Sequence, residues 1–353
     1  MEIFIERIEQ AVTFGIDVYS FEVKPDQPFH GFKSIPQEPR IHVVHFQHSE
    51  NGMRYGYYLE SDSNYVQFDY DRAKELYVPR SLESDQDRKD AYYKFQELSS
   101  FMVAYPSVDE GDSWQEMTKF VKWLDIKYIA GSSGQFVYMD SAITTEEEKK
   151  VLVGVLTSRG QGYRESLPAQ SEASLNYAPI VFKSKEAIRD DHKMQDFLDK
   201  SYYLNEVVLA RYHHSSIYSL LGELQLAFLN TLLFGSYGSS LQWHNILELI
   251  YFSSQVKESV VFELDSMLAG QLKVLPEFYV DTMLNETVWR RIVGESFHED
   301  KLQQTSAAVR KIWPNLDGES DADDYAEVTH HNLSDEGDDD APVVGETVSY
   351  IPR

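Results

Sequence analysis

Three histidines, His42, His45 and His48 in "HVVHFQH", have the residue type and the close spacing of transition-metal ligands. The segment itself is typical of a β-strand, in which successive side chains point to opposite faces. His42 and His48 then share one face while His45 points to the other, so the three imidazoles cannot converge on one ion. We therefore expect core or surface histidines here, and neither a metal site nor a cofactor.

His244 and Glu248 stand one turn apart on a predicted helix. A zinc hydrolase of the HExxH kind needs a second histidine at this spacing, and the sequence has none. We expect an ordinary pair on a helix surface. The alternative is a hydrolase that uses His244 and Glu248 in a cleft between two domains.

Two further catalytic patterns are incomplete. "FGSYGSS" has the glycines of a phosphate-binding loop, but no lysine follows it and it comes after a helix rather than a strand. Gly235 is better interpreted as the residue that ends one helix before a tight turn into the next. Since no GxSxG segment presents a serine as a nucleophile either, the sequence predicts no catalytic residue and a protein that is not an enzyme.

The charge limits the classes of partner. The net charge is −26, and eleven acidic residues with no Lys or Arg lie between Asp317 and Asp340, which leaves about −15 for the rest. Direct binding to nucleic acid needs clustered Lys and Arg, so we expect none, and basic protein surfaces are favoured instead. The chain has no cysteine, no apolar run of eighteen residues and no signal peptide, which predicts a cytoplasmic and nuclear protein without a membrane segment.

The elements that position these residues divide the chain. Strands are predicted by "GIDVYSFEV", "IHVVHFQ", "MRYGYYL" and "YVQFDY", with turns at "SENG" and "SDSN". Helices follow over Asp85–Met102 and Ser113–Leu124, and Thr145 with Glu148 has the spacing of a capping box for another. We interpret residues 1–158 as a β-rich N-terminal domain of α+β type.

The second half has a different pattern. Residues 159–176 mix Gly, Ser, Pro and charge without periodicity, as linkers do. From 177 to 316 apolar residues recur at helical spacing, and "SLLGELQLAFLNTLLF" is apolar nearly all round, which predicts a buried central helix in an all-helical domain. Residues 317–353 are predicted to be an acidic disordered tail that ends in a β-prone segment.

Several long segments of the sequence match a known family. In the first domain these are "FGIDVYSFEV", "QPFHGFKSIP" and "HVVHFQH". In the second they are "SLNYAPIVFKSKEAIRDDHKMQDFLDKSYYLNEVV", "GELQLAFLNTLLFGSYGSSLQWHNILELI" and "LPEFYVDTMLNETVW". From about Val12 to Trp313 the chain resembles the a1-cistron splicing factor family and is close to its fungal members.

This resemblance implies a fold and a role. The first domain would be β-sandwich-like, and the second a superhelical, VHS-like helical domain. The family consists of assembly factors of the U5 small nuclear ribonucleoprotein (U5 snRNP). They bind the large scaffold, pre-mRNA-processing-splicing factor eight, through its RNase H-like and MPN-type domains. Binding keeps the U5 helicase off the scaffold until assembly advances, and no catalysis or cofactor is implied.

Four serines are candidates for regulatory phosphorylation. Ser320 and Ser334 lie in acidic contexts that suit acid-directed kinases. Ser253 and Ser254 follow the apolar run Ile246–Phe252, where the C-terminus of a helix disfavours added negative charge.

The last residues, "APVVGETVSYIPR", have the β-branched and aromatic residues of a strand, yet no neighbouring segment can pair with them. We expect this strand to add to a sheet edge of the scaffold, while pairing with an edge of its own first domain stays open. The expected partner-binding residues are Val343, Val344, Thr347, Val348, Tyr350 and Ile351.

Overall fold

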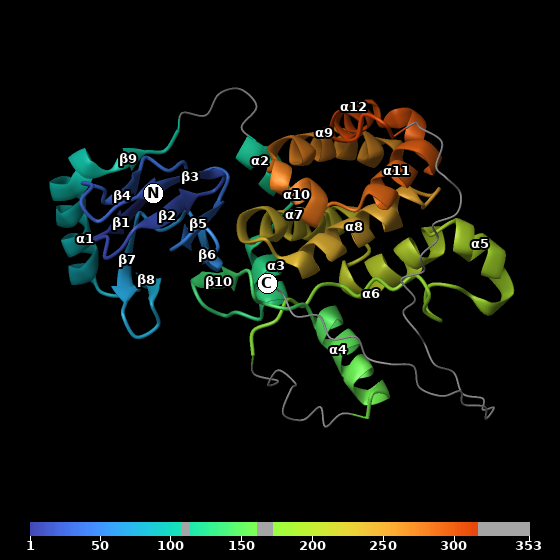
Figure 1. The fold of residues 1–353 in the computed structure, drawn as a ribbon, viewed down its shortest axis with the longest axis horizontal. Helices are drawn as coiled ribbons and strands as arrows, with labels where there is room; N and C mark the ends of the chain where they lie inside the picture. Colours follow the sequence, from blue (N-terminus) through green and yellow to red (C-terminus); the bar gives the residue numbers. More distant parts are fainter. Residues whose placement is uncertain (107–112, 161–171, 317–353) are drawn as a thin grey trace, which may run out of the picture. The chain divides into compact units, whose positions relative to one another are not determined.

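Two five-stranded sheets form the N-terminal part of this computed structural model, which describes residues 1–106, 113–160 and 172–316 (Figure 1). Sheet A has the order β8 (Leu76–Arg80), β7 (Tyr65–Asp71), β1 (Glu2–Ile5), β4 (Gly31–Lys33), β9 (Val103–Ala104). Sheet B is antiparallel throughout, in the order β10 (Phe136–Asp140), β6 (Arg54–Glu60), β5 (Ile41–Gln47), β2 (Val12–Ile16), β3 (Tyr19–Val23).

Alternation along the strands of sheet B builds two separate cores. Val44 and Phe46 of β5 pack into a cluster shared with sheet A, and the Phe46 and Phe68 rings lie 5.6 Å apart across it. Ile41 and Val43 point the other way, into a cluster shared with the helices. The two sheets thus face each other as a β-sandwich, and the expected fold of a β-sheet domain followed by a helical region is confirmed.

One predicted strand is in fact a hairpin. "GIDVYSFEV" breaks at Asp17 and Val18, so that β2 and β3 pair antiparallel with Ile16 opposite Tyr19. Asp17 adopts a φ of 54°, a conformation that Asp tolerates better than most residues. The alternation of apolar residues continues across this tight turn, so the sequence pattern alone did not reveal the turn.

Helices of the first half lie around the sandwich. α1 (Asp85–Leu98) begins at the capping box of Ser84 and Asp87 and covers the outer face of sheet A through Ala91 and Phe4. The helix expected over Ser113–Leu124 is split into α2 (Ser113–Thr118) and α3 (Trp123–Ala130). The capping box of Thr145 and Glu148 is confirmed at the start of α4 (Glu146–Ser158).

The helical region contains α5 to α12. Their bounds are α5 (Lys193–Leu198), α6 (Ala210–Tyr212), α7 (Ile217–Phe234), α8 (Tyr237–Tyr251), α9 (Glu258–Val274), α10 (Glu277–Thr282), α11 (Glu286–Glu295) and α12 (Gln303–Ile312). A π-helix, Tyr203–Leu209, precedes α6, and 3-10 turns occupy Asp190–His192 and Glu299–Lys301. The predicted buried central helix is α7, which by length and composition alone could cross a membrane but is 78% buried inside the fold.

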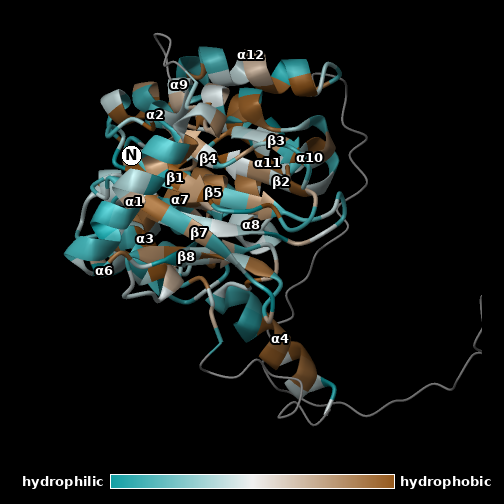
Figure 2. Ribbon diagram, turned by 90° about the vertical axis from the view of Figure 1, so that its left-hand side faces the viewer, coloured by the Kyte–Doolittle hydropathy of each residue, from teal (hydrophilic) through white to brown (hydrophobic). Residues whose placement is uncertain are grey.

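The helix α4 spans thirteen residues, yet none of them is buried. Its apolar positions Val151, Leu152, Val153 and Val155 are each about 40% exposed. Figure 2 shows α4 extending away from the sheets and the other helices, with a hydrophilic first part and a hydrophobic part after it. The apolar residues of this helix therefore do not belong to a core.

A buried chain of hydrogen bonds joins the sandwich to the helices. The Tyr58 hydroxyl on β6 donates to Oδ1 of Asn230 on α7 at 2.9 Å, and Nδ2 of Asn230 donates to the Tyr177 hydroxyl at 2.9 Å. The Tyr177 hydroxyl in turn lies 2.8 Å from Oγ of Ser239 on α8. Residues 1–316 accordingly form one compact unit.

The domain boundaries proposed from the sequence stay predictions. Within the segment assigned as a linker, Leu175 is 1% exposed and pairs with Thr145 in an isolated bridge. Leu175 therefore belongs to the core shared by sandwich and helices.

Removal of the Tyr58 hydroxyl tests the hydrogen-bond chain. Tyr58→Phe leaves Oδ1 of Asn230 buried without its donor, which should lower the free energy of unfolding by about 1–3 kcal/mol. Urea unfolding of the full chain measures the change. The matched control is Tyr93→Phe, at a tyrosine 65% exposed on α1, where the change should be close to zero. Equal stability of the two variants would show that the Tyr58 hydrogen bond contributes nothing to the free energy of unfolding.

Candidate functional site

The expected partner-binding strand and two of the four candidate serines lie outside the described residues. These are Val343, Val344, Thr347, Val348, Tyr350, Ile351, Ser320 and Ser334. Ser253 and Ser254 lie within them, directly after α8, the helix that also carries His244 and Glu248. Four of the residues that the sequence singled out thus lie on α8 or just after it.

Ser253 is enclosed by the helix that precedes it. Its side chain is 0% exposed, and its hydroxyl donates to the Leu249 carbonyl at 2.6 Å. Its own carbonyl accepts a hydrogen bond from Nε2 of His298 at 2.8 Å. A kinase could reach this hydroxyl only after the end of α8 had opened.

Ser254 is exposed and is tied to Asp199. The Ser254 hydroxyl and its backbone N–H, at 3.1 Å, both donate to the Asp199 carboxylate. Ser201 does the same with its hydroxyl at 2.6 Å and its N–H at 3.0 Å. Burial opposes ionisation of Asp199, but these four donors outweigh it and lower its pKa. The carboxylate thus fastens the loop after α8 to the segment after α5.

His244 is fully engaged inside the helical core. Its Nδ1 donates to the Ser240 carbonyl at 2.7 Å, and its Nε2 accepts from the Trp289 indole at 3.0 Å and the Asn285 N–H at 3.1 Å. Glu248 instead accepts from Arg291 at 2.8 Å. Burial lowers the pKa of His244 to about 4, so the imidazole is neutral and has no nitrogen left for a substrate or a metal. The interpretation as an exposed helix-surface pair was wrong for His244, and the hydrolase alternative loses its base.

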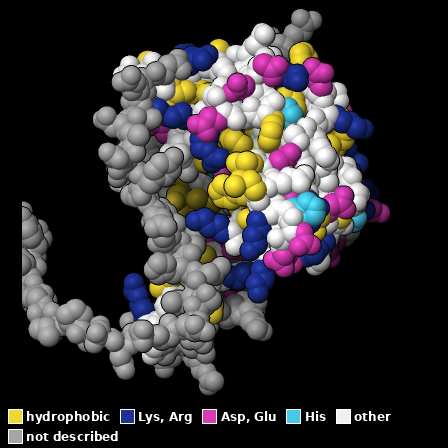
Figure 3. Space-filling model, turned by 90° about the vertical axis from the view of Figure 1, so that its right-hand side faces the viewer, with side chains coloured by type: hydrophobic (Ala, Val, Ile, Leu, Met, Phe, Trp, Pro, Cys, Tyr) yellow, Lys and Arg dark blue, Asp and Glu magenta, His cyan; other side chains and the backbone are white. Residues whose placement is uncertain are grey.

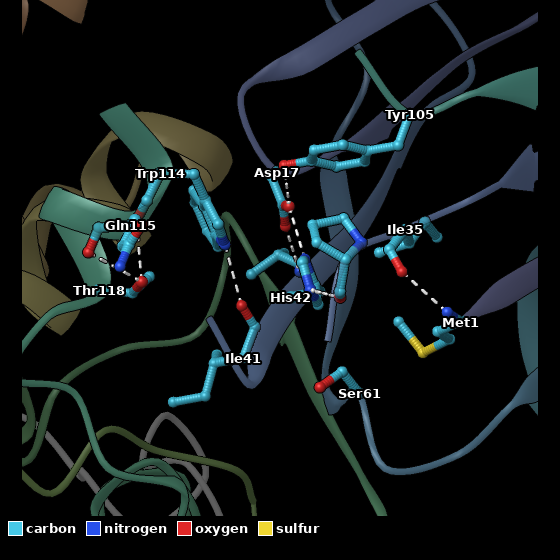
Figure 4. A network of polar contacts seen from close by, with 12 residues as sticks. Met1, Asp17, Ile35, Ile41, His42, Ser61, Tyr105, Trp114, Gln115 and Thr118 are labelled. Atoms are coloured by element: carbon cyan, nitrogen blue, oxygen red, sulfur yellow. Dashed lines mark hydrogen bonds and ion pairs between the residues drawn. The ribbon is translucent and has the colours of Figure 1, made fainter. Parts of the chain in front are cut away.

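The three histidines of β5 and its end are also held by structural contacts. Figure 4 shows His42 directed at the Asp17 carboxylate, 2.7 Å away, which the Tyr105 hydroxyl also contacts. His45 contacts the Asp17 carbonyl at 2.9 Å, while His48 lies 2.8 Å from the Tyr55 hydroxyl. Burial by itself would lower the pKa of His42, but Asp17 reverses the shift and raises it. Within the described ranges no three His, Asp or Glu side chains form a group that could hold a metal ion.

The segment "FGSYGSS" is a helix junction, as expected. Gly235 follows α7 with a φ of 64°, and its N–H bonds to the Thr231 carbonyl. Ser236 then caps α8 by accepting from the Ser239 N–H at 3.3 Å. The glycine thus terminates a helix and does not cradle a phosphate.

A cavity of about 580 Å³ lies between the sandwich and the helices, but neither His244 nor Glu248 lines it. Arg40 and Glu60 line it from the sandwich side, and Lys122 and Asp125 from the segment before and within α3. Burial raises the pKa of Asp125. Because both charge signs alternate around it, this cavity favours no single class of charged ligand.

The protonation of His244 predicts a pH dependence. Its pKa of about 4 in the fold lies below the value of about 6.5 expected in the unfolded chain, so unfolding takes up a proton between these two values. The free energy of unfolding should therefore fall as pH drops from 6.5 towards 4, by up to about 3 kcal/mol from this residue.

Denaturant unfolding across that pH range measures the effect. His244→Gln should flatten the dependence, while His192→Gln, at an exposed histidine, should leave it unchanged. An identical pH dependence in the parent and in His244→Gln would contradict the assignment.

The Asp199 contacts predict the effect of a negative charge at position 254. Ser254→Glu removes a donor and places a second carboxylate beside Asp199, so it should lower the free energy of unfolding by about 1 kcal/mol. Ser254→Ala, which loses the donor without adding charge, should cost less. Raising the salt concentration should narrow the gap between the two variants, and a gap that does not respond to salt would exclude charge repulsion as its cause.

Comparison with known proteins adds information from outside the structure. Residues 2–131 match the model of the AAR2 N-terminal domain, and residues 181–333 match that of the AAR2 C-terminal repeat region. The match includes β1, which lies before the stretch of resemblance quoted from the sequence. The chain is 42% identical over 332 residues to the A1 cistron-splicing factor AAR2 of Saccharomyces cerevisiae, covering 93% of this chain and 92% of that protein.

More distant relatives align over most of their length. The human protein AAR2 homolog is 27% identical over 305 residues, covering 79% of this chain and 77% of its own. The mouse homolog is 24% identical over 303 residues with the same coverage. The similarity thus extends across both the sandwich and the helical region.

Proposed function

This chain belongs to the AAR2 family of A1 cistron-splicing factors, and we propose that within splicing it is an assembly factor of the U5 snRNP. Membership gives the protein a role in splicing. The observation that carries the finer proposal is the 42% identity to a splicing factor over 93% of the chain. Proteins that share a single domain can have different roles, whereas this similarity covers both domains.

The proposed partner is the large scaffold, pre-mRNA-processing-splicing factor eight, bound through its RNase H-like and MPN-type domains. The net charge of −26 supports this proposal because such a protein disfavours phosphate backbones and favours protein surfaces made to hold RNA. Occupying those surfaces keeps the U5 helicase off the scaffold until assembly advances. The protein acts in the cytoplasm and in the nucleus, which fluorescence microscopy of the tagged chain tests.

The proposed mode of action is binding without catalysis. His244 and Glu248, the one candidate acid–base pair, are committed to Ser240, Trp289, Asn285 and Arg291. Their contacts support a packing role. Phosphorylation at Ser254, Ser320 or Ser334 would then tune affinity, since each phosphate adds about −1.5 to −2 charges.

The last residues of the chain are proposed to contribute a strand to a sheet edge of the scaffold. In this proposal the acidic stretch before them links the strand to the folded residues 1–316, and so keeps it near a scaffold that those residues already bind. Deletion of residues 341–353 should weaken binding to a fragment carrying the RNase H-like and MPN-type domains and leave the melting temperature of the free protein unchanged.

Isothermal titration calorimetry and thermal unfolding measure the two quantities on the same preparations. Unchanged affinity with a lowered melting temperature would show instead that the strand belongs to a sheet of the protein itself. Absence of binding by the full chain would contradict the proposed partner altogether.

A further inference from the structure

The short helix α5 presents large apolar side chains to solvent. Met194, Phe197 and Leu198 are 72%, 58% and 59% exposed and stand at positions i, i+3 and i+4, on one face of the helix. We call these three side chains the α5 patch. Figure 3, seen from the side on which α5 lies in Figure 1, shows hydrophobic side chains gathered on this face with Lys and Arg side chains beside them.

A lysine is set into the aromatic border of the patch. Nζ of Lys200 lies 5.3 Å from the centre of the Phe197 ring and 5.2 Å from that of Phe182, and it donates to the Phe197 carbonyl at 2.9 Å. This position fixes the ammonium group beside the exposed ring of Phe197. Burial lowers the pKa of Lys200, which an approaching carboxylate would offset.

The carboxylates nearest to the patch along the chain are used inside the fold. Asp196 is 1% exposed and accepts two bonds from the Arg189 side chain, at 2.8 and 2.9 Å. Asp199 is occupied by Ser201 and Ser254.

Three lysines in the region of α5 carry positive charges that no ion pair neutralises within the described residues. Lys183 and Lys193 are exposed, and in the part of the chain that the structure describes neither they nor Lys200 form an ion pair. Asp190 and Asp191, in the turn before α5, and Glu206 are exposed acidic side chains in this region. The protein has a net charge of −26, so these lysines add positive charge beside exposed apolar side chains on an otherwise acidic protein.

We propose that the α5 patch is a docking surface for an acidic segment of the scaffold, one in which carboxylates alternate with apolar residues. The inference rests on the proposed function. Apolar side chains of that segment cover Met194, Phe197 and Leu198, and its carboxylates reach Lys193 and Lys200. A second copy of this chain is disfavoured as the occupant because a two-fold contact would set these lysines against their own equivalents.

Binding of full-length variants to the fragment with the RNase H-like and MPN-type domains tests the proposal. Phe197→Ala and Lys193→Glu should each weaken binding at least fivefold. The matched controls are Phe262→Ala, at a phenylalanine 75% exposed on α9, and Lys273→Glu, at an exposed lysine of the same helix, which should change it less than twofold. Melting temperatures equal to that of the parent confirm that each variant is folded.

The outcomes separate the two proposals. If the parent does not bind the fragment, the proposed function fails and this inference with it. If the parent binds and the α5 variants behave as the controls do, only the docking surface is wrong.

Two further results bear on the occupant. A loss with Phe197→Ala but none with Lys193→Glu, at low and at high salt alike, would overturn the acidic character of the segment. Sedimentation showing a dimer of the parent that these variants dissociate would assign the patch to a second copy.

Discussion

The hydrogen bonds from Tyr58 through Asn230 and Tyr177 to Ser239 fix how the two halves of this protein meet. Each group in this series is buried, so any relative movement of sheet B and α7 would leave a polar atom without a partner. Apolar packing alone tolerates small shifts, whereas an unpaired buried amide or hydroxyl is costly. The arrangement of sandwich and helices is therefore set by polar contacts inside an apolar core.

The same principle explains the polar residues that the sequence offered as chemistry. His42 and Asp17 secure the turn between β2 and β3 against β5, and His244 connects α8 to α11. Histidine suits this task because its two ring nitrogens can satisfy a donor and an acceptor at once. In the scheme proposed above, partners bind at the surface, through the α5 patch and the last residues of the chain.

Sequence reasoning succeeded where the determining interactions are local. The strand over Ile41–Gln47, the capping box at Thr145 and the helix end at Gly235 each depend on residues within a few positions. It failed where distant segments decide. β1 has only four residues, and it is a strand because β4 and β7 flank it.

The candidate site shows the same division. Nothing within "WHNILE" reveals that Trp289 and Asn285 lie against His244, and nothing within "KMQDFL" tells an exposed apolar face from a buried one. Burial is a property of the whole fold, and the short α5 carries too few residues for a periodic pattern to disclose it.

The sharing of sheet B between two cores has a consequence for the nascent chain. Ile41, Val43 and Tyr58 are synthesised early and share a core with α2, α3 and α7, but α7 ends only at Phe234. At bacterial or eukaryotic translation speeds this interval lasts on the order of ten seconds. Until α7 is complete, the apolar face of sheet B that it covers stays partly exposed to solvent. We expect chaperones that bind apolar surfaces cotranslationally to bind this face of sheet B and to dissociate once α7 has emerged and packed against it.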